Sequence, residues 1–220
     1  MRIAAVSGTC SRAGKTALAE TLLRALPAGA AAAVKFTTTE DVFERCPRGS
    51  TCVVCDIDVP FRLIADPAVL REAGTDTDRL AAAGASRVLW AIAREGAAKE
   101  AWSAVERSLR DEPLVVLEGS TVVERGLARP DLALFVAHRA VPPERWKPTS
   151  AALIAAAHRV IVHAEGAAAS PAVLSGLAAA GGAGKTVVAD VTRPLAEWAP
   201  DLAAKTLALA DAGVAASGAR

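Results

Sequence analysis

Near the start of the chain, glycine, lysine and hydroxyl residues are spaced as in a loop that binds phosphate. Apolar residues 3–6 are followed by Gly8-Thr-Cys-Ser-Arg-Ala-Gly14-Lys15-Thr16, and leucines then recur at helical spacing. In a strand, a glycine-rich loop and a helix in that order, loop N–H groups and the helix N-terminus point toward an anion. Lys15 supplies a positive charge, and the Thr16 hydroxyl is a ligand for Mg²⁺. The residues expected to contact a nucleoside triphosphate are Gly8, Thr9, Ser11, Arg12, Ala13, Gly14, Lys15 and Thr16.

A carboxylate at the end of an apolar run is the second chemical feature. Residues 114–117 predict a strand buried on both faces, and Glu118 follows them directly. At the end of a strand beside the phosphate-binding loop, such a carboxylate holds Mg²⁺ through water or positions the attacking water. Lys15 and Glu118 are therefore the predicted catalytic residues, and Thr16 and Glu118 are the predicted Mg²⁺ ligands. The alternative is a strand that merely ends in glutamate.

Polar residues also end the second predicted strand, at 31–36. Lys35 lies near its end, and Thr37, Thr38, Thr39, Glu40 and Asp41 follow it. Loops at the carboxyl ends of strands are where an open α/β sheet binds ligands. These hydroxyls and carboxylates either reach Mg²⁺ or a γ-phosphate, or they form a solvated polar loop.

Three of the four cysteines, Cys46, Cys52 and Cys55, fall within ten residues of one Pro- and Gly-containing segment. Thiolates on a short loop can converge on zinc, on a [4Fe–4S] cluster, or on a metal shared by two chains. A fourth ligand could be Cys10, which would couple the metal to the nucleotide. The alternatives are a Cys52/Cys55 redox pair, or small buried side chains. For Cys10 itself the alternative is a small packing residue.

The elements that must position these residues alternate between strands and helices. Strands are predicted at 3–6, 31–36, 86–93, 114–118, 130–137, 159–163 and 186–191. Helices are predicted at 15–26, 98–110, 151–157 and about 200–212, with a short helix that Asp76 or Thr77 caps and that ends at Gly84. This alternation predicts one α/β domain spanning residues 1–220, with a mostly parallel, doubly wound sheet of about seven strands. The cysteines would lie in an insertion loop at about 40–60.

A second Gly-Lys-Thr occurs at residues 184–186, but the predicted elements around it are in the wrong order. A helix precedes it and the strand-like Thr-Val-Val-Ala-Asp-Val follows, whereas a phosphate-binding loop needs a helix after the lysine. This segment is therefore predicted to be a helix end and a turn.

Composition excludes several classes of function. Lys and Arg number 25 against 24 Asp and Glu, so no basic field points to nucleic acid. No apolar run approaches the ~18–20 residues of a membrane span, and residues 1–20 lack the pattern of a signal peptide. We therefore expect no membrane association and a cytoplasmic location, where the cysteines would be reduced and metal ligation is favoured over a disulfide.

The loop resembles two groups of P-loop NTPases. Gly14 stands six positions after Gly8, one more than in G-x-x-x-x-G-K-[ST], and dethiobiotin synthetase and the cobyrinic acid amidating enzymes have a similar loop. The related signature-lysine subgroup has a second lysine where this chain has Cys10.

Residues 1–125 resemble MobB, the molybdopterin-guanine dinucleotide biosynthesis adaptor family. The resemblance lies in the phosphate-binding loop, Val34-Lys35-Phe-Thr-Thr-Thr, Asp76-x-x-Arg79-x-x-x-Ala83-Gly84-Ala85 and Leu117-Glu118-Gly119. The chain departs from MobB in having threonines in place of histidines after Lys35, a longer loop, and the cysteine segment. The resemblance implies a P-loop NTPase fold, nucleotide binding and a homodimer, with Lys15, Thr16 and Glu118 serving phosphate, Mg²⁺ and the catalytic water.

Together these features predict Mg²⁺-dependent binding and hydrolysis of ATP or GTP by an accessory factor of metallocofactor assembly, acting with a cofactor-biosynthesis partner protein. Two alternatives stay open. One is a small-molecule ligase or kinase of the dethiobiotin synthetase type, and the other is a nucleotide-binding adaptor without enzymatic activity. The motif that selects guanine in related GTPases, Asn-Lys-x-Asp, is replaced here by His163-Ala-Glu-Gly, so the base is not specified.

Overall fold

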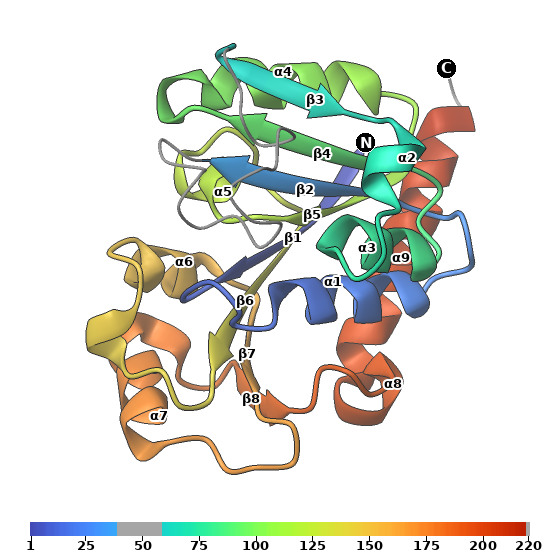
Figure 1. Ribbon diagram of the computed structural model, residues 1–220. Helices are drawn as coiled ribbons and strands as arrows, with labels where there is room; N and C mark the ends of the chain where they lie inside the picture. The colour runs from blue at the N-terminus through green and yellow to red at the C-terminus, as the bar shows by residue number, and fades with distance from the viewer. Residues whose placement is uncertain (39–58, 219–220) are drawn as a thin grey trace.

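The computed structural model describes residues 1–38 and 59–218, and its strands form one sheet (Figure 1). The sheet order within the described residues is β3-β4-β2-β5-β1-β6-β7-β8. Every neighbouring pair is parallel except β3 and β4, which are antiparallel. The strands are β1 (Arg2–Gly8), β2 (Ala32–Thr38), β3 (Phe61–Ile64), β4 (Val88–Ala93), β5 (Leu114–Glu118), β6 (Leu132–His138), β7 (Arg159–His163) and β8 (Thr186–Ala189).

Helices cover both faces of this sheet, because successive strand residues point to opposite sides. In β1, Ala4 and Val6 pack toward one helical layer, and Ile3 and Ala5 pack toward the other. The first layer contains α1 (Lys15–Arg24), α2 (Pro67–Leu70), α3 (Asp76–Ala82), α8 (Leu195–Trp198) and α9 (Pro200–Gly218). The second contains α4 (Ala98–Ser108), α5 (Thr121–Glu124), α6 (Ser150–Ala156) and α7 (Pro171–Leu177). The chain is a single compact α/β domain, as its element order predicts.

Two of the helices show how the sequence determines their position. In α4 the apolar residues Trp102 and Val105 recur at helical spacing and are buried, together with Leu109 just beyond its end. Asp66 caps α2 by accepting a hydrogen bond from the Ala68 N–H, and Pro67 occupies the first helical position.

Three details differ from expectation. The described sheet has eight strands rather than about seven, because the four-residue edge strand β3, which contains a charged Arg62, has too short an apolar pattern to be recognised. Thr75, not Asp76 or Thr77, caps α3, since Thr75 has the extended backbone of a cap and its hydroxyl accepts from the Asp78 N–H. The last helix continues to Gly218 instead of ending near 212.

The strand order creates a crevice beside β1. From β1 the chain crosses over β5 to β2, whereas β6, β7 and β8 add to the other side of β1. At such a reversal the loops leave the carboxyl ends of adjacent strands in opposite directions, and ligands of open α/β sheets bind there. The predicted cysteine insertion at about 40–60 lies almost entirely outside the described residues.

None of the helices in the described parts of the chain is long and apolar enough to cross a membrane.

Candidate functional site

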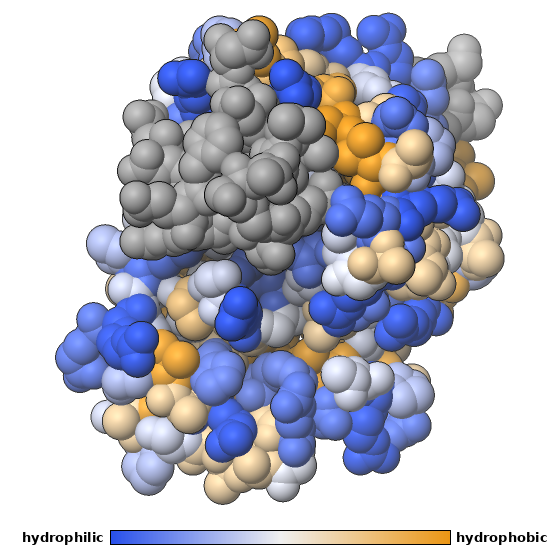
Figure 2. Space-filling view, viewed as in Figure 1, coloured by the Kyte–Doolittle hydropathy of each residue, from blue (hydrophilic) through white to orange (hydrophobic). Residues whose placement is uncertain are grey.

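A cleft of about 940 Å³ opens at the carboxyl ends of the central strands. Among the coloured residues of Figure 2, those directly below the grey region are mostly blue or white, which marks them as hydrophilic or intermediate. The cleft is lined by the loop between β1 and α1, by the ends of β2 and β5, by α3, and by the segments that follow β6, β7 and β8. It therefore lies at the sheet reversal, where the fold favours a ligand.

The predicted phosphate-binding loop, residues 8–16 and called the phosphate loop below, forms the middle of the cleft. Its last glycine, Gly14, has φ = 104°, a left-handed conformation, and α1 starts at the next residue. A Cβ at Gly14 would lie 2.9 Å from the His163 ring. Only glycine fits this position, and the close packing places the N-terminus of α1 at the cleft surface.

The beginning of the phosphate loop is fastened to the sheet. The Gly8 N–H donates to the Ser120 Oγ at 3.4 Å, and the Thr9 N–H donates to the Val136 carbonyl at 3.1 Å. Thr9 and Ala13 are fully buried. Of the residues predicted to contact the nucleotide, Ser11, Arg12, Gly14, Lys15 and Thr16 line the cleft. Gly8, Thr9 and Ala13 lie beneath it and hold the loop in shape.

Lys15 is folded back onto its own loop. Its Nζ donates to the Cys10 carbonyl at 2.9 Å. Burial lowers the pKa of Lys15, and the nearby charge of Glu118 only partly opposes this. A buried ammonium whose charged form is disfavoured gains most when an anion arrives beside it, so Lys15 is well suited to bind phosphate.

A cluster of charged residues occupies the β2 and β5 end of the cleft. Lys35 and Glu118 face each other across β2 and β5, and the Lys35 Nζ lies 3.2 Å from the Glu118 Oε2. Lys35 also forms an ion pair with Asp76 at the start of α3. The Thr16 hydroxyl lies close enough to the Asp76 carboxylate to help lower its pKa. Thr16 and Glu118, predicted to act together, thus both lie beside the Asp76 and Lys35 ion pair.

The pKa values of this cluster reflect mutual charge stabilisation. Burial by itself lowers the pKa of Lys35, but the charges of Glu118 and Asp76 outweigh it and raise that pKa above its ordinary value. Burial likewise tends to raise the pKa of Asp76, yet Lys35 and the Thr16 hydroxyl lower it below the ordinary value. Lys35 and Asp76 are therefore both charged at neutral pH.

The sequence predicts Asp76 only as a helix cap or as part of a family pattern, whereas the structure places its carboxylate in the charged cluster of the cleft. Arg79, one turn further along α3, binds the buried Glu20 of α1 through two hydrogen bonds of 3.2 and 2.5 Å. This pair fastens α3 to α1, and so holds Asp76 over the phosphate loop. The signal in the sequence is an Asp and an Arg three positions apart, a spacing that brings their side chains together on one face of a helix.

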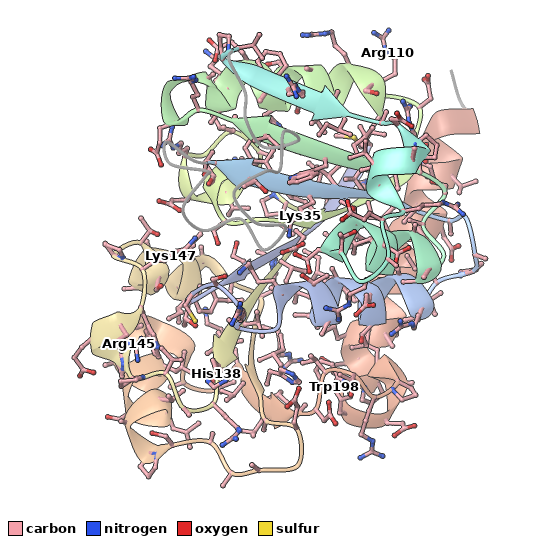
Figure 3. All side chains as sticks on the ribbon, viewed as in Figure 1. Lys35, Arg110, His138, Arg145, Lys147 and Trp198 are labelled. Atoms are coloured by element: carbon pink, nitrogen blue, oxygen red, sulfur yellow. The ribbon has the colours of Figure 1, made fainter. Side chains whose placement is uncertain are left out.

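The opposite end of the cleft has a different character. It is lined by His138, Arg139, Lys147, His163, Glu165 and Thr192. The His163 Nδ1 accepts from the Val191 N–H at 3.4 Å, which leaves its Nε2 to donate to Glu165 at 3.0 Å. Figure 3 shows Lys35 near the middle of the view, with His138 and Lys147 toward the β6 side. The cleft thus has two chemically distinct ends, one on each side of the phosphate loop.

Oxygen donors at the β2 and β5 end suit a hard cation. The Thr16 hydroxyl and the carboxylates of Asp76 and Glu118 are the kind of ligands that Mg²⁺ takes in proteins. A cation already lies between the two carboxylates, namely the Lys35 ammonium. The residues present therefore fit Mg²⁺.

The metal or iron–sulfur site predicted from the cysteines does not fall within the described residues. Cys46, Cys52 and Cys55 lie outside them, as do Glu40 and Asp41. Within residues 1–38 and 59–218, no group of three or more His, Cys, Asp and Glu side chains converges as a metal site. Cys10 is half-buried against the core, and its Sγ accepts from the Thr9 hydroxyl at 3.6 Å.

The second Gly-Lys-Thr lies away from the cleft. Gly182 ends a helical segment, and Thr186 begins β8, as the sequence predicts. The Lys185 Nζ donates to the carbonyls of Ala155 and Ala157 at 2.7 and 2.9 Å. This lysine closes the end of α6 and is a structural residue.

Comparison with known proteins gives no match to a family model, to a curated protein or to a solved structure. The chain's own residues therefore carry the functional conclusion.

Proposed function

We propose that this protein binds a nucleoside triphosphate together with Mg²⁺ and hydrolyses its terminal phosphoanhydride bond. One observation carries the proposal. The N-terminus of α1, with Lys15 and Thr16, opens into the same cleft as the Lys35, Asp76 and Glu118 cluster. Groups that bind phosphate and groups that suit Mg²⁺ and a water nucleophile are thus brought together in one open cleft.

The two ends of the cleft give the nucleotide a direction. The terminal phosphate belongs at the β2 and β5 end, because the carboxylates and Lys35 are there. The remaining phosphates then follow the phosphate loop, where α1 contributes its N–H groups and its dipole. The ribose and base extend toward His163, Glu165 and Thr192 at the other end.

Catalysis by this site depends on position and charge. Water attacks the γ-phosphorus, the bond to the β-phosphate oxygen breaks, and the negative charge on the leaving diphosphate is stabilised by Lys15 and the loop N–H groups. The Glu118 carboxylate is buried at the cleft floor, where it orients the attacking water. Bound Mg²⁺ would be held by the Thr16 hydroxyl and by the carboxylates of Asp76 and Glu118, and it would neutralise phosphate charge.

The test is nucleotide binding and phosphate release by the full chain with ATP and with GTP, in Mg²⁺ and in EDTA. Glu118→Gln keeps the shape and a hydrogen-bonding oxygen of the side chain but loses the charge. We expect it to retain nucleotide binding and to lose hydrolysis about 100-fold. Glu124→Gln makes the same chemical change at an exposed position on α5 and serves as the matched control.

Absence of Mg²⁺-dependent binding of either nucleotide would contradict the proposal. Tight binding with negligible turnover would instead favour the nucleotide-binding adaptor. The same titrations decide between ATP and GTP.

A second candidate is phosphoryl transfer to a small molecule. The cleft continues past Lys35 along the end of β2 to Thr37 and Thr38, and the Thr38 hydroxyl lies 2.7 Å from that of Thr121. These hydroxyls could hold an acceptor carboxylate or hydroxyl beside the terminal phosphate. Turnover that begins only when a metabolite is added would favour this ligase or kinase over simple hydrolysis.

The role in metallocofactor assembly stays a prediction, because it rests on Cys46, Cys52 and Cys55 and on the resemblance to MobB. Anaerobic purification followed by metal analysis and an absorption spectrum tests it. Iron with a broad band near ~400 nm would indicate a cluster, and stoichiometric zinc would indicate a structural site. Size measurement in solution tests the predicted homodimer.

A further inference from the structure

The Asp76 and Glu118 pair is already neutralised in part by a side chain of the same protein. The Lys35 Nζ lies 3.2 Å from the Glu118 carboxylate and is ion-paired with Asp76. The Lys35 side chain is 19% exposed and that of Glu118 is 5% exposed. The Asp76 side chain is 40% exposed and has Arg79 at 4.0 Å, so loss of the Lys35 charge would affect the buried Glu118 carboxylate most.

The same oxygens cannot serve Lys35 and a metal ion equally well. A divalent cation that reaches Asp76, Glu118 and the Thr16 hydroxyl must displace the ammonium or share its ligands at short range, where two positive charges repel. Without another anion in the cleft, the displaced ammonium would lose its partners while remaining largely buried. The metal therefore enters the free protein at a penalty.

A triphosphate removes that penalty. Lys35 lines the cleft, and lysine carries its charge on a flexible four-carbon chain that can change partners. If the terminal phosphate occupies the β2 and β5 end, its oxygens offer the released ammonium a new anionic partner. Lys15 does not replace Lys35 in the cluster, because its Nζ is bound to the Cys10 carbonyl.

We propose that Lys35 is a resident counter-ion of the Asp76 and Glu118 pair that a divalent cation must displace, so that metal binds tightly only together with a triphosphate. When Lys35 moves from the carboxylates to the terminal phosphate, binding of the metal and binding of the triphosphate become coupled, and Lys35 is thus a positioning residue for the metal. The coupling to the triphosphate rests on the proposed function, whereas the competition between Lys35 and the metal does not.

The test is titration of Mn²⁺ alone, followed by electron paramagnetic resonance, on the full chain without nucleotide. We expect weak binding by the natural protein and at least tenfold tighter binding by Lys35→Met and by Lys35→Gln, which both remove the charge. Lys35→Arg keeps the charge and is expected to bind Mn²⁺ as weakly as the natural protein. Lys147→Met removes a positive charge from the same cleft outside the cluster, and we expect its Mn²⁺ affinity to change less than twofold.

Thermal melting of each variant in EDTA and in Mn²⁺ keeps the result interpretable. Lys35→Met removes the ammonium next to the buried Glu118 carboxylate and leaves Asp76 with Arg79 alone, so we expect this variant to melt at a lower temperature in EDTA and to recover with Mn²⁺. Equal Mn²⁺ affinity in Lys35→Met, Lys35→Gln and the natural protein would overturn the proposal, as would equal tightening in Lys35→Arg.

Coupling to the triphosphate is measured with AMP-PNP, a non-hydrolysable ATP analogue, and with the corresponding GTP analogue. In the natural protein we expect Mg²⁺ to strengthen binding of the analogue. In Lys35→Met we expect the ratio of the analogue's affinities with and without Mg²⁺ to be at least fivefold smaller. An unchanged ratio would overturn the proposed coupling between metal and triphosphate. Failure of both analogues to bind, together with tighter Mn²⁺ binding by Lys35→Met, would instead contradict the proposed function and leave the competition with metal supported.

Discussion

The chain contains the tripeptide Gly-Lys-Thr twice, and the two copies have opposite fates. At residues 14–16 it begins the ten-residue helix α1, and Lys15 and Thr16 line the cleft. At residues 184–186 it begins strand β8, and Lys185 is bound to two carbonyls near the end of α6. The same three residues therefore form a candidate phosphate site where a helix follows them, and a structural contact with α6 where a strand follows them.

The physical reason is the direction of the backbone groups. A helix that starts at the lysine leaves its first N–H groups unpaired and aims them at one point, where they favour an anion. In a parallel strand the N–H groups alternate in direction and are used by neighbouring strands. The same substitution made in each of the two copies tests this explanation.

The largest difference is expected for the lysines. Lys15→Ala should lower the rate of nucleotide hydrolysis at least 100-fold, because charge stabilisation at the terminal phosphates is lost. Lys185→Ala should leave hydrolysis within about twofold and lower the free energy of unfolding by about 1–2 kcal/mol, since two hydrogen bonds to carbonyls disappear. Phosphate release and urea denaturation measure the two effects. Similar losses of activity in both variants would show that the comparison is wrong.

The threonines come next. Thr16→Val should raise the Mg²⁺ concentration needed for half-maximal hydrolysis about tenfold, because a hydroxyl ligand is removed. Thr186→Val should leave the Mg²⁺ dependence unchanged. The Thr186 hydroxyl donates to the Gly182 carbonyl at 2.8 Å, so its loss should cost about 1 kcal/mol of stability. Mg²⁺ titrations that move equally in the two variants would speak against a ligand role for Thr16.

The smallest difference is expected for the glycines, because both have positive φ. Gly14→Ala and Gly184→Ala should each cost about 1–2 kcal/mol of unfolding free energy through left-handed backbone strain. Only at Gly14 would the added methyl also meet the His163 ring, whereas nothing lies within 4 Å at Gly184. We therefore expect nucleotide affinity to fall about fivefold in Gly14→Ala alone, measured by calorimetric titration. Equal nucleotide affinities of Gly14→Ala and Gly184→Ala would mean that the His163 contact does not determine the conformation of the phosphate loop.

Local sequence signals predicted most of the elements correctly. The apolar runs of β1, β2 and β4–β7, the spacing of apolar residues in α1 and α4, and the order of elements around both Gly-Lys-Thr copies are patterns within short segments. Such patterns show whether a segment buries one face or two, and they can be recognised from the residues of that segment alone. The edge strand β3 was missed because four residues with one charge carry too little periodicity.

The composition of the charged cluster could not be predicted in the same way. Lys35, Asp76 and Glu118 are 41 and 42 residues apart in turn, and each is compatible with a solvated surface when seen alone. They meet because β5 lies between β1 and β2 in the sheet and because Arg79 fastens α3 to α1. Strand order is a matter of long-range pairing, which no local pattern encodes. The phosphate loop thus follows from neighbouring residues, whereas the ion pairs that surround it exist only once the sheet and α3 have packed together.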